Sequence, residues 1–270
     1  MKKIILIGDF AIDISKHVRV TKLCPEAPVP VVVPVPIKTF HTDGMAGNVL
    51  ANLKSMSGMS NDNLIVIKPE GVSRKTRIID EATGYILLRI DEDYSSPPFD
   101  AYKFKSYING DVAAVVISDY AKGFLNEGNI EFIAACSRNM GIPTFLDTKL
   151  ILGEWSRDVF CVKINQIEFT QNVLSIEKPE RYCRNLIVTQ ADKGTILLNS
   201  RGHKYFDPKK VNVADVCGAG DTMLAGLVLE YINTSNLEKA IKFANDVASF
   251  AVTKRGVYQV TQEDLKELKL

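Results

Sequence analysis

The chain has 270 residues, of which 46% are apolar and 24% charged, and its 33 basic side chains nearly balance its 32 acidic ones for a net charge of +1. Such a composition is typical of a soluble globular protein with a full core, in one large domain or two small ones. No long basic run is present, which argues against a nucleic acid or a membrane surface as the main partner.

The cysteines and the amino terminus indicate a cytoplasmic protein. The five cysteines are scattered and lack any Cys-x-x-Cys spacing, so we expect reduced thiols and no zinc site. The apolar run Ile4–Ile7 is too short for a signal sequence, and Asp9 interrupts it. We therefore predict a first strand here rather than a targeting segment.

This first strand is a continuous apolar run, as expected for a strand buried on both faces of a parallel sheet. Asp9 and Asp13 follow it, and in an extended chain these two carboxylates share a face. Carboxylates at the carboxyl end of a parallel strand commonly line a ligand crevice and can accept hydrogen bonds from sugar hydroxyls. Both could instead bind local N–H groups; we predict a ligand role for Asp13 and a structural role for Asp9.

Two segments predict a small β-rich lid apart from the main sheet. Residues 25–36 hold five prolines, which excludes a helix or a central strand and favours an extended edge segment. Residues 75–91 predict a hairpin that turns at 81–84. We expect lid segments at about 16–40 and 75–91, which would cover the site or clasp a second copy of the chain.

Between these segments, residues 41–48 open a helix that we expect to run to about Met56. Glycines at its start, including Gly44, allow a close approach of the backbone to a ligand. Asn48 could offer its amide to that ligand, or it could simply cap the helix.

From residue 100 onwards, strands and helices alternate. We predict strands at 112–117, 143–146, 159–164, 186–188, 195–198 and 203–206, the last two as an antiparallel pair, and helices at 126–139, 165–173, 219–232 and 236–254. This order is typical of an α/β fold with three α/β/α layers, in which helices cover both faces of a mostly parallel sheet.

Polar groups follow three of these strands, where open α/β sheets bind their ligands. They are residues 118–123, with Asp119 and Lys122, residues 147–149, with Lys149, and residues 165–168. In the last group, Asn165 and Glu168 have the spacing of a capping box. The same pair could organise the waters of a nucleotide-bound Mg²⁺, an ion that takes few direct carboxylate ligands. The spacing alone does not separate these two hypotheses.

The motif Gly218-Ala219-Gly220-Asp221 precedes a long apolar run that predicts a buried helix. Small residues bring the backbone close to a ligand, and a helix amino terminus attracts anions. A carboxylate beside such an anion site is unfavourable unless it handles a proton there, which makes Asp221 a candidate base. Alternatively, the motif is a glycine-rich turn with an acid in the first helical turn.

Taken in order, these motifs resemble those of the ribokinase-like (PfkB-type) carbohydrate kinase family. Asp13 resembles the sugar-binding acid of the family, Gly44 to Asn48 its glycine-rich substrate motif, Asn165-Gln166-Ile167-Glu168 its Mg-ATP motif, residues 186–198 with Thr189 and Gly194 its nucleotide-binding strand-turn-strand, Asn245 its adenine-bordering helix, and Asp215 to Asp221 its catalytic signature. The resemblance covers nearly the whole chain and implies one kinase domain over residues 1–270.

Within the family, the chain is most similar to the D-glycero-β-D-manno-heptose-7-phosphate kinases, the kinase half of a bifunctional ADP-heptose synthesis enzyme. The similarity lies in Pro-Glu-Ala-Pro-Val-Pro-Val at 25–31, Lys75-Thr76-Arg77, residues 88–91, residues 118–123 and Asp147-x-Lys149. Two departures stand out. Met45 replaces a glycine of the family, and the segment from Asn48 to Lys75 is so short that we expect a strand-helix unit to be missing around residues 58–61.

The resemblance implies ATP-dependent phosphorylation of a sugar, here the anomeric hydroxyl of a heptose 7-phosphate. It implies Asp221 as the base, Gly218, Ala219 and Gly220 as the anion hole, Mg²⁺ bound through water at Asn165 and Glu168, and a monovalent cation such as K⁺ beside Asp215. The sugar would contact Asp13, Gly44, Asn48 and Asp119. A substrate phosphate needs a cation, and the candidates are Lys75, Arg77, Lys122 and Lys149.

Two other hypotheses remain open. The chain could phosphorylate another sugar or a nucleoside that carries no phosphate. It could also be a catalytically silent homologue that binds sugar or nucleotide, in view of the shortened segment and Met45. The lid suggests a homodimer, although a lid that closes within a monomer fits equally well.

Overall fold

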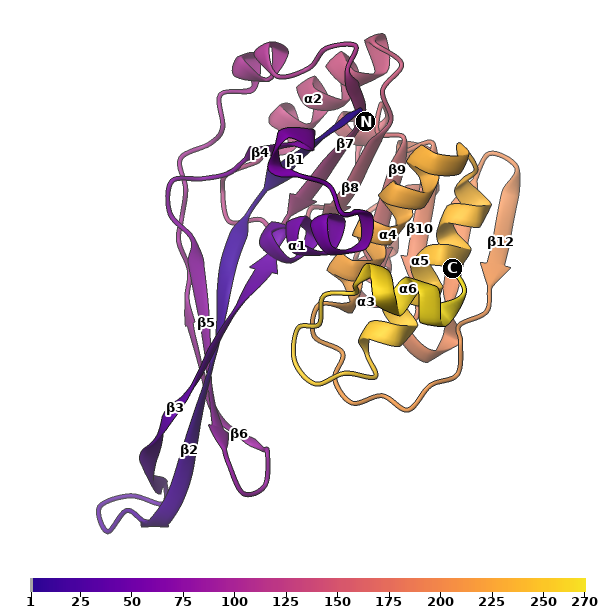
Figure 1. Ribbon diagram of the computed structural model, residues 1–270. Helices are drawn as coiled ribbons and strands as arrows, with labels where there is room; N and C mark the ends of the chain where they lie inside the picture. The colour runs from indigo at the N-terminus through magenta and orange to yellow at the C-terminus, as the bar shows by residue number, and fades with distance from the viewer. Residues whose placement is uncertain (1) are drawn as a thin grey trace.

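The computed structural model describes residues 2–270 and contains an eight-stranded main sheet and a separate four-stranded sheet (Figure 1). The main sheet has the order β12-β11-β10-β9-β8-β7-β1-β4. Its strands are β1 (Lys3–Gly8), β4 (Leu64–Ile67), β7 (Val112–Asp119), β8 (Thr144–Thr148), β9 (Cys161–Asn165), β10 (Asn185–Thr189), β11 (Thr195–Asn199) and β12 (Gly202–Phe206). All neighbours are parallel except the β10–β11 and β11–β12 pairs, which confirms the predicted sheet.

Helices cover both faces of the main sheet, and β1 shows why its sequence is apolar throughout. Ile4 and Leu6 pack into a core with α1, α4 and α5, whereas Ile5 and Ile7 pack into a second core with α2 on the opposite face. The helices are α1 (Ala46–Ser57), α2 (Glu127–Asn139), α3 (Gln166–Ser175), α4 (Ala219–Thr234), α5 (Leu237–Ala251) and α6 (Gln262–Leu268). Short 3₁₀ helices lie at Asn61–Asn63, Ala101–Ser106, Glu154–Ser156, Pro179–Tyr182 and Ala191–Lys193. These layers confirm the predicted α/β/α architecture.

The small sheet has the order β3-β2-β5-β6 and extends away from the main body as an arm (Figure 1). Its strands are β2 (Phe10–Leu23), β3 (Pro30–Met45), β5 (Ser73–Asp80) and β6 (Ile86–Glu92). The proline-containing β3 is an edge strand, as predicted, because proline has no N–H for a second ladder. The predicted hairpin is the antiparallel β5–β6 pair.

The structure adds two elements that the sequence analysis did not predict, β4 and α6. Strand β4 follows α1 closely and pairs in parallel with β1, from Ile4 opposite Leu64 to Ile7 opposite Ile67. The expectation that a strand-helix unit of the family is missing here stays a prediction. The run Leu64–Ile67 has the same length and apolar character as Ile4–Ile7, so the strand signal was present and the sequence analysis overlooked it. Within residues 2–270, no helix is long and apolar enough to cross a membrane. All five cysteines are free thiols.

Candidate active site

A cavity of about 120 Å³ lies where the small sheet meets the carboxyl ends of the main-sheet strands. The small sheet contributes Asp13, Gly44, Met45, Lys75 and Arg77, and the main body contributes Asn48, Tyr120, Cys217, Gly218, Asp221 and Val257. Six of the predicted site residues therefore meet in one cavity with the predicted base. Carboxyl ends of parallel strands are the usual place for a ligand in such sheets.

Asp221 is buried in the first turn of α4, and both of its carboxylate oxygens accept hydrogen bonds. The Asn48 amide donates to Oδ2 at 3.0 Å, and the Tyr120 hydroxyl donates to Oδ1 at 2.9 Å. Burial raises the pKa of Asp221 to about 6, while the Asn48 and Tyr120 bonds and the Lys163 charge oppose this rise. The group is therefore ionised at neutral pH and still basic enough to take a proton.

The turn before Asp221 brings backbone close to the cavity. Gly218 has φ of +79°, a conformation that favours glycine, and a Cβ at this position would lie 2.6 Å from the Asn48 amide nitrogen. Gly220 lies beside the Lys163 ammonium, since a Cβ on this glycine would be 3.4 Å from Nζ. The Ala219 N–H donates to Val216 O at a long 3.3 Å. The amino terminus of α4 thus faces the cavity with small residues, a suitable arrangement for an anion.

A buried ion pair lies behind this turn. Lys163 on β9 is 2.7 Å from Asp147 on β8, and their side chains are 5% and 7% exposed. Burial alone would lower the pKa of Lys163, but the carboxylates of Asp147, Glu168 and Asp221 together offset burial and the pKa is raised, so the ammonium stays charged. The sequence analysis gave Lys163 no role. The signal was one lysine within an otherwise apolar buried strand.

On the small-sheet side, Asp13 Oδ1 accepts a hydrogen bond from Arg77 at 2.6 Å. A Cβ at Gly44 would lie 2.3 Å from Asp13 Oδ2, so the glycine makes room for this carboxylate. The next residue, Met45, has φ of +57° and ψ of −135°, which is strained for any residue with a side chain. A glycine would adopt this conformation without that strain.

The four candidate cations differ in their partners. Among residues 2–270, Lys75 has no ion-pair partner, and its Nζ lies 5.6 Å from the centre of the Tyr120 ring. Lys149 pairs with Glu168, and Lys122 pairs with Asp93 at 2.6 Å. Lys75 and Arg77 line the cavity, whereas Lys122 and Lys149 do not.

Asp119 also lies outside the cavity. Its buried carboxylate accepts from the Thr148 hydroxyl at 2.6 Å and from the Ala121 N–H at 3.0 Å, and burial raises its pKa to about 6. Asp9 accepts from the N–H groups of Tyr120 at 2.8 Å and Lys122 at 3.3 Å, which confirms its predicted structural role. Both acids hold the loop that carries Tyr120.

The Asn165 and Glu168 pair forms the capping box of α3. Asn165 Oδ1 accepts from the N–H groups of Ile167 and Glu168, and Glu168 Oε2 accepts from the Asn165 N–H at 2.7 Å. The other Glu168 oxygen contacts the Lys149 ammonium. The carboxylates of Asp147, Glu168 and Asp221 outnumber the two lysines that contact this group, Lys149 and Lys163. Among residues 2–270, no three Asp, Glu, His or Cys side chains form a group that could hold a metal ion directly, and both Glu168 oxygens are already bound, so a divalent cation here would be held through water.

The other predicted nucleotide residues lie along the same sheet edge. Thr189 stands opposite Asn165 in the β9–β10 ladder, the Gln166 side chain bonds Gln190 at 2.6 Å, and Ile167 is exposed. Gly194 has φ of +86°, and a Cβ there would lie 2.2 Å from Phe206 O. Asn245 accepts from the Thr195 hydroxyl at 2.7 Å, while its buried amide nitrogen has no partner among the described residues. That nitrogen is a donor suited to a ligand.

Asp215 joins two loops near the catalytic turn. Its oxygens accept from the N–H groups of Cys217 at 2.9 Å and Gly256 at 3.0 Å. Burial alone would raise its pKa, but these hydrogen bonds lower it. The carboxylate is therefore ionised, with both oxygens already bound to backbone.

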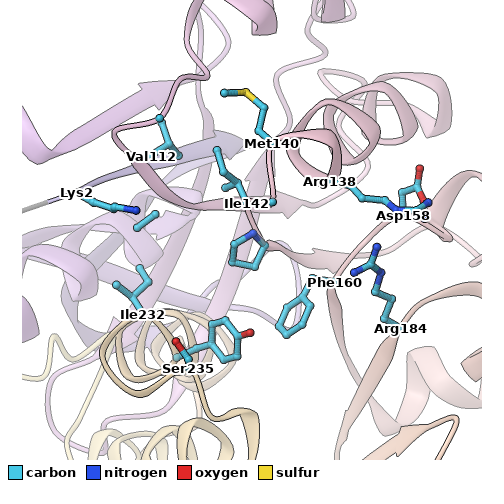
Figure 2. Close-up of a pocket in the computed structure, with 15 residues that line it drawn as sticks. Lys2, Val112, Arg138, Met140, Ile142, Asp158, Phe160, Arg184, Ile232 and Ser235 are labelled. Atoms are coloured by element: carbon cyan, nitrogen blue, oxygen red, sulfur yellow. The ribbon is translucent and has the colours of Figure 1, made fainter.

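A larger hollow of about 740 Å³ lies at the opposite, amino-terminal edge of the main sheet (Figure 2). Lys2, Arg138 and Arg184 line it with Phe160 and Ile232, and Arg138 pairs with Asp158. It contains none of the predicted site residues. Helices α2 and α4 end here, and cations at such ends offset the partial negative charge of the last carbonyls. We therefore place the chemistry in the smaller cavity.

Comparison with known proteins decides the family. A family model described as pfkB family carbohydrate kinase matches residues 43–264. The chain belongs to this family. Membership makes it an ATP-dependent carbohydrate kinase, and such kinases use ATP with a divalent metal ion.

Among relatives of this pfkB-family kinase is the bifunctional protein HldE of Bradyrhizobium diazoefficiens, 27% identical over 311 residues, 98% of this chain and 62% of the relative. HldE of Campylobacter jejuni strain RM1221 is 28% identical over 305 residues, 99% and 64% of the two chains. The chain thus spans less than two thirds of the length of these relatives.

Solved structures confirm the ribokinase-like fold. Thermotoga maritima ribokinase superposes with a TM-score of 0.71 at 17% identity and covers 100% of both chains. Escherichia coli phosphofructokinase-2 in complex with fructose-6-phosphate superposes with a TM-score of 0.72 at 16% identity, over 99% of this chain and 98% of that one.

Proposed function

We propose that this kinase transfers the γ-phosphoryl group of ATP to the anomeric hydroxyl of a heptose 7-phosphate, with Asp221 as the base. The observation that carries the proposal is the position of Asp221. Its buried carboxylate, held by Asn48 and Tyr120, opens on the same cavity as Gly218 and the cations Lys75 and Arg77.

In this mechanism the sugar hydroxyl gives its proton to Asp221 while its oxygen attacks the γ-phosphorus, and ADP leaves as the bond from the γ-phosphorus to the β,γ-bridging oxygen breaks. N–H groups of Gly218, Ala219 and Gly220, at the positive end of α4, stabilise the charge on the transferring group. When bound, Mg²⁺ at Asn165 and Glu168 would neutralise charge on the β and γ oxygens. A K⁺ ion beside Asp215 would steady the same turn, and activity that rises with K⁺ would support this part.

The substrate's own phosphate is assigned to Lys75 and Arg77. Of the two, Lys75 has no carboxylate partner among residues 2–270, so it can bind an anion without breaking an ion pair. Arg77 already holds Asp13 at 2.6 Å, and this pair would present one acceptor and one donor to a sugar phosphate. The similarity to the heptose 7-phosphate kinases supports the choice of sugar and a place in ADP-heptose biosynthesis in the cytoplasm, where ATP is available.

We further propose that the small sheet acts as a lid and as a homodimer clasp on a single kinase domain. Lys75 and Arg77 lie on one face of β5, toward the cavity. Ile90 stands opposite Thr76 and Leu88 opposite Ile78, so these side chains lie on the other face, where Leu88 and Ile90 are exposed. The polar face would bind the substrate, and the apolar face would pack against a second copy of the chain.

The first experiment is ADP release with Mg-ATP and a panel of acceptors: heptose 7-phosphate, other sugar phosphates, free hexoses and ribose. We expect strong stimulation by the heptose phosphate. Stimulation by free sugars alone would keep the kinase and reject this substrate. No stimulation by any acceptor, despite ATP binding, would favour the silent homologue, which the base and anion turn argue against.

The variant Lys75→Met tests the phosphate contact. We expect the KM for the sugar phosphate to rise about 10- to 100-fold, because a charged hydrogen bond contributes on the order of 1.5–3 kcal/mol. The KM for ATP should not change. Lys122→Met removes a lysine that pairs with Asp93 outside the cavity and serves as the matched control. Equal effects of both variants would contradict the assignment.

A further inference from the structure

Tyr120 was not among the predicted site residues, yet its side chain lines the cavity and contacts Asp221, Lys75 and Lys149. It follows β7 by one residue, and its backbone N–H donates to Asp9 at 2.8 Å. Its hydroxyl donates to Asp221 Oδ1 at 2.9 Å. The backbone and the hydroxyl are thus fixed by two separate acids.

Two ammonium groups fix the ring as well. Lys75 Nζ lies 5.6 Å and Lys149 Nζ 5.1 Å from the ring centre, both within the range of a cation–π contact. Lys75 belongs to the small sheet, and Lys149 pairs with Glu168 at the start of α3. The orientation of the phenol therefore depends on both sides of the cavity.

We propose that Tyr120 is a positioning residue for the base: with Asn48, its hydroxyl holds the Asp221 carboxylate in the orientation that takes the sugar proton. This inference rests on the proposed role of Asp221. Asn48 binds one oxygen and Tyr120 the other, so the carboxylate cannot turn about its axis without breaking a hydrogen bond. A carboxylate has about four acceptor positions, so the two bonds leave room for the substrate hydroxyl.

The hydroxyl also favours the charged form of Asp221. The groups that face this carboxylate are Asn48 from α1, Asp147 from β8, Lys163 from β9 and Tyr120 itself. Burial and the Asp147 charge raise the pKa of Asp221, whereas Asn48, Tyr120 and Lys163 lower it. Burial and the nearby carboxylates raise the pKa of Tyr120 well above its usual value, so the phenol remains a donor at working pH.

The variant Tyr120→Phe removes only the hydroxyl and keeps the ring between the two lysines. We expect kcat to fall about 10-fold at pH 6.5, on the lower side of what a positioned proton acceptor contributes. The acid limb of the kcat profile should move up by about one pH unit, because the pKa of Asp221 rises when a donor to its charged form is lost. The KM for ATP should stay within about 2-fold. Tyr205→Phe, at an exposed tyrosine on β12, is the control and should change nothing.

Replacing Tyr120 with 3-fluorotyrosine strengthens the hydrogen bond from its hydroxyl to Asp221, where Tyr120→Phe removes it. The hydroxyl itself is kept. Its more acidic hydroxyl is a stronger donor, so the acid limb should move to lower pH. This measurement remains decisive if Tyr120→Phe folds poorly. An unchanged acid limb in both variants would overturn the positioning role.

The variant Asp221→Asn separates the two proposals. If Asp221→Asn keeps the wild-type kcat, the proposed function fails. If Asp221→Asn is inactive while Tyr120→Phe has the wild-type kcat and pH profile, the function stands and the inference about Tyr120 is wrong. If both proposals are correct, adding Tyr120→Phe to Asp221→Asn should cause no further loss of kcat, because the two residues act as one unit. A further loss there would show a structural effect and overturn the inference.

Discussion

The acidic side chains of the main sheet and of the small sheet have opposite surroundings. At the carboxyl edge of the main sheet, burial raises the pKa of Asp119 and Asp221 to about 6. In the small sheet, a hydrogen bond from Thr83 lowers the pKa of Asp80, and one from Arg89 lowers that of Asp91. Acids whose pKa is raised by burial become suited to proton transfer, whereas acids whose pKa is lowered by hydrogen-bond donors serve to hold turns and strands.

The apolar side chains of the two regions differ in the same way. The strands of the main sheet lie between two layers of helices, and Ile4, Ile117 and Phe145 are fully buried. In the small sheet, Ile37 and Leu88 are exposed. A sheet that lacks a covering layer gains little from burial, so the small sheet depends on the main body, the substrate or a second copy for its position.

Asp221→Asn is expected to have the largest effect on the main-sheet side of this comparison. We expect kcat to fall by roughly 10² to 10⁴, the usual scale for a positioned base, because an amide cannot accept the hydroxyl proton. Steady-state kinetics and nucleotide titration would measure this. Nucleotide affinity should remain nearly unchanged, and a wild-type kcat would remove Asp221 from its role.

Two glycines with the same backbone requirement sharpen the comparison between the regions. Gly218 has φ of +79°, and a Cβ added there would lie 2.6 Å from the Asn48 amide nitrogen, whereas Gly84 has φ of +75° and no atom within 4 Å of its added Cβ. Alanine at either position should lower stability by about 1 kcal/mol through backbone strain. Only Gly218→Ala should also lower kcat, by about 10²-fold, because its methyl group displaces the Asn48 amide that donates to Asp221. Similar kinetics for both variants would show that the contact with Asn48 does not matter.

The exposed face of the small sheet can be tested through self-association. Leu88 on β6 is 55% exposed, and Leu174 on α3 of the main body is 82% exposed. We expect Leu88→Lys to weaken the dimer at least about 10-fold, since a charge in a buried apolar interface is unfavourable. Leu174→Lys should leave association unchanged. Sedimentation equilibrium would compare the two, and a wild-type chain that stays monomeric would reject the clasp.

The acids also predict a smaller effect on stability, opposite in sign to the effect on activity. A carboxyl group with a raised pKa favours the folded state as it protonates, so Asp119 and Asp221 should each add about 1 kcal/mol to the unfolding free energy between pH 7 and pH 5. Asp80 and Asp91 of the small sheet have lowered pKa values, so they stabilise the fold at neutral pH. This stabilisation is lost only as the pH falls below about 4. Over pH 7 to 5, kcat should fall while stability in urea rises. A fall in both would contradict the buried acids.

The sequence by itself determined the elements and the motifs. Continuous apolar runs such as Ile4–Ile7, the prolines of 25–36 and the glycines before Asp221 carry local information, because burial period, missing N–H groups and backbone freedom act within a few residues. They were sufficient for the mostly parallel sheet, the edge strand β3 and the start of α4. The short β4 was overlooked, although Leu64–Ile67 is a continuous apolar run of the same kind as Ile4–Ile7.

Tertiary structure alone decided which side chains meet. Asp119 and Tyr120 are neighbours in sequence, but their side chains have different partners. Asp119 accepts a hydrogen bond from Thr148, whereas Tyr120 donates one to Asp221, 101 residues away. Lys75 and Lys122 are both lysines near candidate motifs, and the structure separates them because Lys75 lines the cavity whereas Lys122 pairs with Asp93 outside it. Such choices depend on the register of strands and on charges brought together across the fold, which no local pattern contains.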